Sequence, residues 1–124
     1  MVPEPPRALV IEDDEAIRAV IEAVLGDEGW AVREAPGAAA ALAILAEWRP
    51  DVILLDLMLP GMDAAGFRAA QRDRALALDV PLIVVSASRG TTARAVELGA
   101  AAALTKPFDL DELLTTVARV RDGR

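Results

Sequence analysis

The sequence predicts an α/β protein with one doubly wound sheet of five parallel strands. Short apolar runs of strand length alternate five times with segments whose apolar residues recur at helical spacing. The chain has 124 residues, 54% of them hydrophobic, which is enough for one domain with a core and too few for two. Strict alternation favours a parallel sheet with helices on both faces, because right-handed crossovers place them there.

The first strand is expected at 7–12, where the apolar run RALVIE ends in acid. From Asp14 the apolar residues change to helical spacing, which predicts a helix that Gly26 and Gly29 close. The second strand is expected at 30–35, because the run WAVREA alternates.

An alanine-rich helix is expected at 37–48 and ends before Pro50. The third strand is expected at 51–56, where DVILLD is apolar on both faces, as in a parallel sheet. A loop with a Pro-Gly pair covers 57–64, and a third helix is expected at 65–76.

The fourth strand is the buried run at 80–87, and a short helix at 91–98 ends at a glycine. A fifth strand of weak propensity is expected at 101–105. Asp109 then caps the last helix, with Glu112 three residues on as in a capping box. Five such units favour the flavodoxin-like strand order 2-1-3-4-5, whose ligand crevice lies at the carboxyl ends of the strands.

Charge and composition exclude several classes of function. The net charge is −7 and no basic run exists, which disfavours direct binding of nucleic acid. The chain has neither cysteine nor histidine, so thiolate or histidine metal sites and catalysis by a histidine base are excluded. No apolar run approaches the about 18 residues of a membrane helix. A soluble cytoplasmic protein is therefore expected.

Polar residues stand at the ends of four predicted strands. They are Glu12, Asp13 and Asp14, then Asp56, then Ser86, and finally Thr105 and Lys106. Taken singly, each has an ordinary explanation, such as a helix cap or a surface lysine. Because parallel strands end at one edge, however, all should converge. Crowded carboxylates favour a hard cation such as Mg²⁺. Lys106, the only lysine among 13 basic residues, can reach a phosphoryl oxygen as a compact charge. This set points to phosphoryl transfer to a carboxylate.

On these motifs the chain resembles the receiver domains of two-component response regulators, over essentially its whole length. LVIEDDEAIR resembles the first acidic motif of that family, and DVILLDLMLPGMD its phosphoacceptor strand and loop. LIVVSA and LTKPF resemble its hydroxyl and lysine motifs. One such motif alone is weak, whereas all four in order at strand ends are specific.

The resemblance implies a role for each matching residue. Asp56 would be the phosphoacceptor, and Ser86 and Lys106 would bind the phosphoryl group. The implied Mg²⁺ ligands are Glu12, Asp13, Asp56 and the backbone carbonyl of Met58. Asp13 is the more direct ligand of the acidic pair, and Asp14 is secondary. The peptide bond between Lys106 and Pro107 would be cis.

Three positions depart from the pattern of the family. Ala103 stands where an aromatic residue is usual, so no ring can follow a movement of Ser86. The span from Ser86 to Gly99 is shorter than usual, which shortens the fourth helix or the loop before it. Ala64 replaces a common glycine at the entry to the third helix.

The sequence therefore predicts a single-domain receiver at 7–121, with short tails at 1–6 and 122–124. It would accept a phosphoryl group on Asp56 from the phosphohistidine of a partner kinase or phosphotransfer protein. It would signal by phosphorylation-dependent protein–protein binding, as a monomer or a phosphorylation-dependent dimer. Apart from its own phosphorylation and dephosphorylation, no enzymatic activity is expected, and neither nucleic acid nor a membrane is an expected partner.

Two alternatives stay open: a receiver-like binding module that works without phosphorylation, and the receiver domain of a longer regulator. A flavin-binding redox protein on the same fold is disfavoured, because the acidic run EDDEA would repel a phosphate that lacks a metal.

Overall fold

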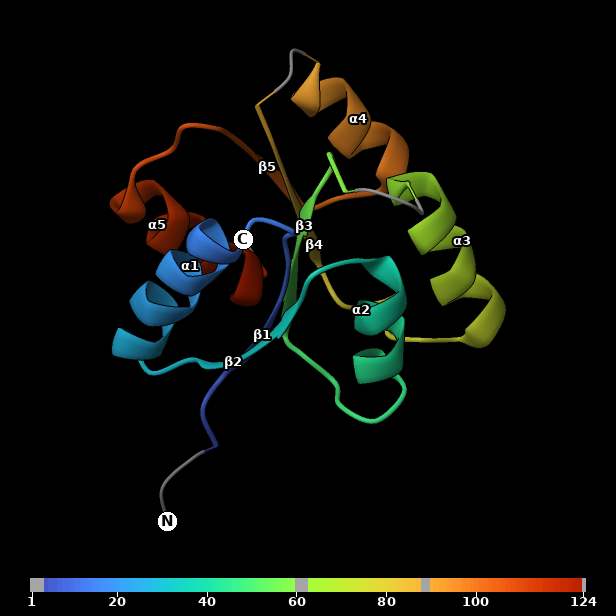
Figure 1. Cartoon of the computed structure of the whole chain (residues 1–124), viewed down its shortest axis with the longest axis horizontal. Coiled ribbons are helices and arrows are strands. Elements are labelled where there is room, and N and C mark those ends of the chain that lie inside the picture. The colour runs from blue at the N-terminus through green and yellow to red at the C-terminus, as the bar shows by residue number, and fades with distance from the viewer. Residues whose placement is uncertain (1–3, 60–62, 88–89, 124) are drawn as a thin grey trace.

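A computed structural model describes residues 4–59, 63–87 and 90–123. Its five strands are β1 (Arg7–Ile11), β2 (Ala31–Ala35), β3 (Val52–Asp56), β4 (Leu82–Ser86) and β5 (Ala102–Thr105). Its five helices are α1 (Glu15–Asp27), α2 (Ala38–Leu45), α3 (Ala64–Arg74), α4 (Thr91–Leu98) and α5 (Leu110–Arg121). Strands and helices alternate along the whole described chain, as predicted (Figure 1).

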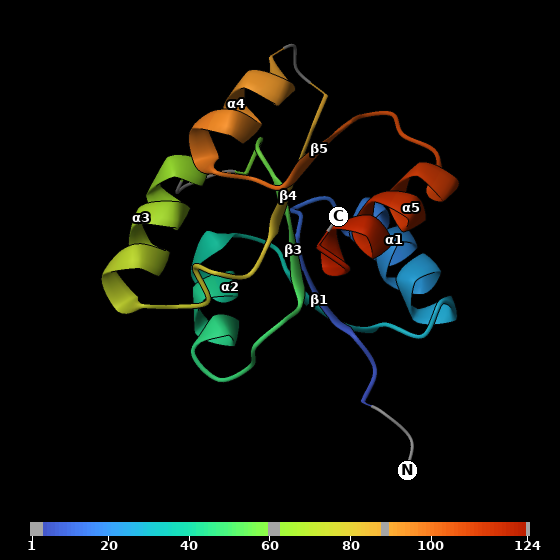
Figure 2. The ribbon, with the colours of Figure 1, turned by 180° about the vertical axis from the view of Figure 1, so that it is seen from behind.

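The strands form one parallel sheet in the order β2-β1-β3-β4-β5. Helices α1 and α5 cover one face, and α2, α3 and α4 cover the other, as the front and back views agree (Figures 1 and 2). The predicted doubly wound fold and its strand order are confirmed.

The two faces of the sheet carry separate halves of the core. Successive strand residues point to opposite faces, so Leu9 packs in the cluster that contains Phe67, and Val10 packs in the cluster that contains Leu25. All five residues of β3 are buried. This double burial explains why the central strands are continuous apolar runs.

Several element ends differ from the sequence expectations. Gly26 lies inside α1, and only Gly29, with φ +90°, follows the helix in a left-handed conformation. Helix α2 is shorter than predicted and ends at Leu45. Strand β4 begins at Leu82, after Pro81, which has no N–H to donate to a neighbouring strand. The predicted loop residues 60–62 lie outside the described part of the chain.

The tryptophans lie at the edge where the strands begin. Trp30 immediately precedes β2 and is buried, with the Arg121 guanidinium 5.8 Å from its ring centroid. Trp48, between α2 and β3, has the guanidinium groups of Arg7 and Arg33 5.4 and 5.1 Å from its ring centroid. Both rings therefore pack at element ends.

Candidate functional site

The predicted polar residues meet at the carboxyl edge of the sheet. Asp56 is the last residue of β3 and Ser86 the last of β4, while Glu12 follows β1 and Lys106 follows β5. The register aligns these ends, with Asp56 opposite Val85. Four strands thus deliver polar groups to one edge, as the sequence predicts.

Lys106 joins two of the carboxylates. Its Nζ lies 2.8 Å from Glu12 Oε1 and 3.2 Å from Asp56 Oδ2. The Glu12 and Asp56 side chains are 3% and 5% exposed, whereas Lys106 is 21% exposed. One partly exposed ammonium therefore compensates two buried acids.

The three charges shift one another's pKa. Burial, followed by the neighbouring Asp56, raises the pKa of Glu12 from 4.5 to about 7, although Lys106 opposes this rise. Burial alone would also raise the pKa of Asp56. Three interactions outweigh burial and lower the pKa of Asp56: the hydrogen bond from protonated Glu12, the hydrogen bond from the Met58 N–H, and the charge and hydrogen bond of Lys106. Burial would lower the pKa of Lys106, but Glu12 and Asp56 raise it. Of the buried pair Glu12 and Asp56, it is therefore Asp56 that stays ionised in the metal-free site.

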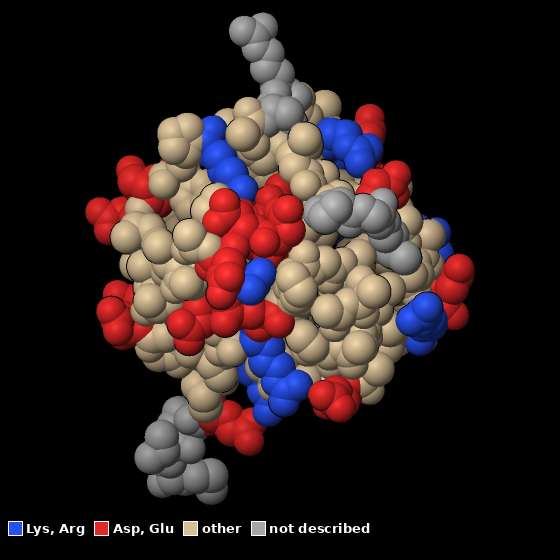
Figure 3. Space-filling view, in the orientation of Figure 1, with Lys and Arg blue, Asp and Glu red and all other residues tan. Residues whose placement is uncertain are grey.

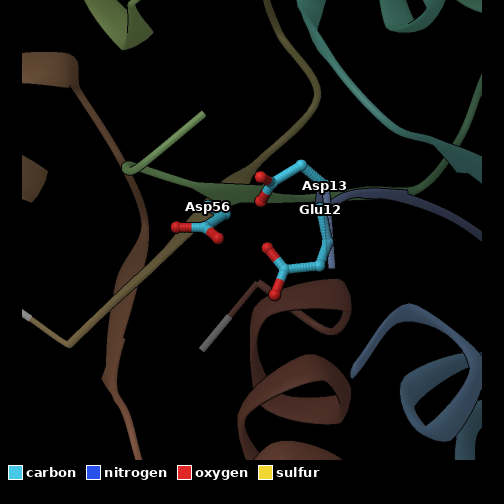
Figure 4. A group of neighbouring side chains, drawn as sticks. All are labelled: Glu12, Asp13 and Asp56. Atoms are coloured by element: carbon cyan, nitrogen blue, oxygen red, sulfur yellow. The ribbon is translucent and has the colours of Figure 1, made fainter. Parts of the chain in front are cut away.

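An oxygen-rich cluster at this edge fits a divalent cation. Glu12, Asp13 and Asp56 each offer one carboxylate oxygen, and these oxygens lie within 4.8 Å of one another. Figure 4 shows the three carboxyl groups facing a common space. When Glu12 is ionised, its buried Oε2 has no hydrogen-bond partner among the described residues. A carboxylate set with an orphaned oxygen is the donor chemistry that Mg²⁺ prefers.

Local backbone geometry aims these side chains. Asp14 caps α1 by accepting the Ile17 N–H at 3.0 Å. Its carboxylate therefore serves the helix end rather than the metal site. The Met58 N–H donates to Asp56 Oδ1 at 2.9 Å, while the residue as a whole is 65% exposed. The Lys106–Pro107 peptide bond is cis, as the resemblance implied.

Ser86 and Ala103 flank the site on β4 and β5. Ser86 is fully buried, and its carbonyl accepts the Lys106 N–H at 2.9 Å. Ala103 is partly buried and packs against the core on the α2–α4 face. Residues 88–89, in the segment where the sequence departs from the family spacing, lie outside the described residues.

The sequence did not point to two further features of this edge. Arg18 on α1 donates from Nη1 to the Glu12 carbonyl at 2.8 Å. No local pattern signals this contact, because it joins a helix side chain to a backbone carbonyl six residues earlier, outside the helix. An apolar groove of about 480 Å³ lies beside Lys106. It is lined mainly by α1 and by the segment after β5, including Ile17, Val20, Phe108 and Leu110.

Acidic side chains gather near the middle of the face seen in Figure 1, with basic side chains beside them (Figure 3). This distribution accords with the net charge of −7. An anionic group approaching such a face is repelled unless cations neutralise the acids.

Comparison with known proteins decides the family. The family described as response regulator receiver domain matches residues 8–118. The chain belongs to the receiver domain family. Response regulator MprA of Mycobacterium sp. strain KMS is 37% identical over 119 residues, covering 94% of this chain and 50% of that protein. The chain spans about half the length of such curated relatives.

Solved receiver structures have the same fold. The chemotaxis response regulator CheY4 of Vibrio cholerae is 29% identical with a TM-score of 0.85, covering 94% of this chain and 98% of that one. A putative response regulator from Chloroflexus aurantiacus is 29% identical with a TM-score of 0.85, covering 95% and 98%. Receiver domains of two-component systems are phosphoacceptors for histidine kinases rather than conventional enzymes. Among the described residues, no helix is both long and apolar enough to span a membrane.

Proposed function

We propose that this receiver accepts a phosphoryl group on Asp56 from the phosphohistidine of a partner kinase or phosphotransfer protein. The observation that carries the proposal is the state of Asp56. Its carboxyl group is buried, yet its pKa is lowered, and it is held by the Met58 N–H and the Lys106 ammonium. An ionised carboxylate fixed at a strand end is a ready nucleophile.

In the proposed reaction, a carboxylate oxygen of Asp56 attacks phosphorus and forms an acyl phosphate. The phosphorus–nitrogen bond of the donor breaks, and its electron pair returns to the imidazole. Lys106 then pairs with the phosphoryl oxygens, because its Nζ already lies 3.2 Å from the acceptor carboxylate. The Ser86 hydroxyl, at the end of the neighbouring strand, would donate to the same group. These residues act by position and charge.

The proposed Mg²⁺ ligands are Glu12, Asp13, Asp56 and the backbone carbonyl of Met58. Bound Mg²⁺ would neutralise negative charge that otherwise accumulates when a phosphoryl group meets these acids. The orphaned Glu12 oxygen and the spacing of the three carboxylates support this assignment. Within the chain, Lys106 supplies the remaining positive charge.

The phosphodonor must bring its histidine to Asp56 from outside these residues, because the sequence contains none. The apolar groove beside Lys106 supports docking of a partner protein there. Val20 and Leu110 on its walls are 50% and 44% exposed, so the groove presents contiguous apolar surface to solvent. Burying such a surface would hold a donor next to the acceptor.

We further propose that the receiver unit spans 7–121, between tails at 1–6 and 122–124, and that output is phosphorylation-dependent protein–protein binding, as a monomer or a dimer. The bounds are supported by β1, which starts at Arg7, and α5, which ends at Arg121. The length of the curated relatives favours the alternative that these residues are the receiver part of a longer regulator. Ala103 favours the other alternative, a module that signals without phosphorylation, because no aromatic ring at this position can follow a movement of Ser86.

The test is the intact mass of the protein after incubation with a small-molecule phosphodonor, with and without Mg²⁺. Wild type should gain one phosphoryl group only with Mg²⁺, and Asp56→Asn should gain none. Asp79→Asn, which removes an exposed aspartate that pairs with Arg49, is the matched control and should react like wild type. An Asp56→Asn protein that is still labelled would place the acceptor elsewhere. Unlabelled wild type would favour the phosphorylation-independent module.

A further inference from the structure

Arg18 connects the acidic loop of the site to the outer strand β2. Its side chain is only 18% exposed, although it lies on the first helix of the domain. Its Nη1 donates to the Glu12 carbonyl oxygen at 2.8 Å, and its Nε lies 3.3 Å from Glu34 Oε1 on β2. A single side chain of helix α1 thus contacts both the loop and the strand.

Both backbone polar groups of Glu12 are held through this region. The Glu12 N–H donates to the Ala35 carbonyl at the end of β2 at 3.0 Å, and the Glu12 carbonyl accepts from Arg18. Asp14, two residues on, is fixed as the cap of α1. The short segment between β1 and α1 is therefore tied on both sides, and this segment carries the Glu12 and Asp13 carboxylates.

Restraint is needed here because the acids must be ionised to bind Mg²⁺, and the ionised carboxylates that meet at the edge repel one another. Lys106 compensates Glu12 and Asp56 through their side chains, whereas Arg18 acts on the backbone. A charge-assisted hydrogen bond to that carbonyl opposes rotation of the peptide unit that would turn the acids away from each other.

We infer that Arg18 is a positioning residue for the metal site: it holds Glu12 and Asp13 in the orientation that presents their carboxylates to Mg²⁺. This inference rests on the Mg²⁺ site of the proposed function. Outer groups that orient metal ligands typically change metal affinity about 10- to 100-fold when removed. The lower end applies to Arg18, because it holds the backbone of the ligand residue rather than the carboxylate.

The experiment is Mg²⁺ titration of the folded, full chain by calorimetry, on wild type and three variants. Arg18→Ala should weaken Mg²⁺ binding about tenfold, and Arg18→Lys should restore part of the loss, since an ammonium can still reach the carbonyl. Arg33→Ala is the matched control. It removes an arginine of β2 that forms an exposed ion pair with Glu47, and its affinity should match wild type. If Arg18 served only to pack α1, its loss would lower stability and leave Mg²⁺ affinity unchanged.

A second readout needs no metal. In EDTA, the amide order parameter of Asp13, measured by NMR relaxation, should fall in Arg18→Ala and stay unchanged in Arg33→Ala. Failure of wild type to bind Mg²⁺ would count against the proposed metal site, and Arg18 would then be judged by the NMR result alone. Unchanged Mg²⁺ affinity in Arg18→Ala, or an unchanged order parameter of Asp13, would overturn the inference.

Discussion

The buried Glu12 carboxyl group makes the stability of the metal-free protein depend on pH in a defined direction. Its pKa rises from 4.5 to about 7, first because of burial and then because of Asp56. Between these pH values the folded protein keeps a proton that the unfolded chain releases. The free energy of unfolding should therefore fall, through this group, as pH rises from about 4.5 to about 7.

The perturbation is Glu12→Gln, which removes the titration but keeps an oxygen that can accept from Lys106. Each unit of pKa shift corresponds to about 1.4 kcal/mol, so the full shift is worth about 3 kcal/mol. Of this, about 2 to 3 kcal/mol develops between about pH 5 and pH 8. Wild type should lose that much stability relative to the variant across this range.

The assay is urea unfolding followed by circular dichroism in EDTA, at several pH values. With a urea dependence of about 1 to 3 kcal/mol per molar, the midpoint difference between the two proteins should change by about 1 to 3 M. Glu22→Gln, which removes an exposed acid of α1, is the control and should run parallel to wild type. Parallel midpoints for wild type and Glu12→Gln over the whole range would refute the reasoning.

Three further predictions concern the site, the core and a helix end. Lys106→Arg should slow phosphorylation of Asp56 in intact-mass time courses, because a planar guanidinium replaces a compact ammonium between two carboxylates; an unchanged rate would contradict this. Phe67→Ala should cost about 3 to 5 kcal/mol in urea unfolding, because the ring is fully buried; a cost under about 1 kcal/mol would mean that the core refills the space. Asp109→Ala should cost about 1 kcal/mol by losing an N-cap bond of 2.7 Å. The exposed Asp111, replaced in the same way, serves as its control, and equal stabilities of the two variants would argue against the cap.

The sheet could be predicted because its signals are local. β3 reads as a strand from its apolar run alone, and a parallel sheet then brings the ends of β1, β3, β4 and β5 to one edge without further information. For the same reason Asp56 and Lys106, fifty residues apart, could be assigned to one site before any contact was known.

Other features depend on distances that no local pattern encodes. Gly26 reads as a helix end, yet packing of α1 carries the helix through it. The pairing of Arg18 with Glu34 requires the relative placement of α1 and β2. The raised pKa of Glu12 follows from its burial beside Asp56, whereas the sequence suggests only that the acids are crowded.

Both tryptophans lie at the edge where the strands begin, and this placement determines which changes tryptophan fluorescence can detect in this protein. Strands of five residues separate that edge from the acids by roughly 15 Å. Neither indole contacts the carboxylates, so binding of a cation or a phosphoryl group does not affect tryptophan fluorescence through direct contact. A change in that emission on activation would be evidence that a rearrangement has crossed the sheet. Unchanged tryptophan fluorescence in a protein whose intact mass shows a phosphoryl group would mean that the structural change is confined to the edge that carries the acids.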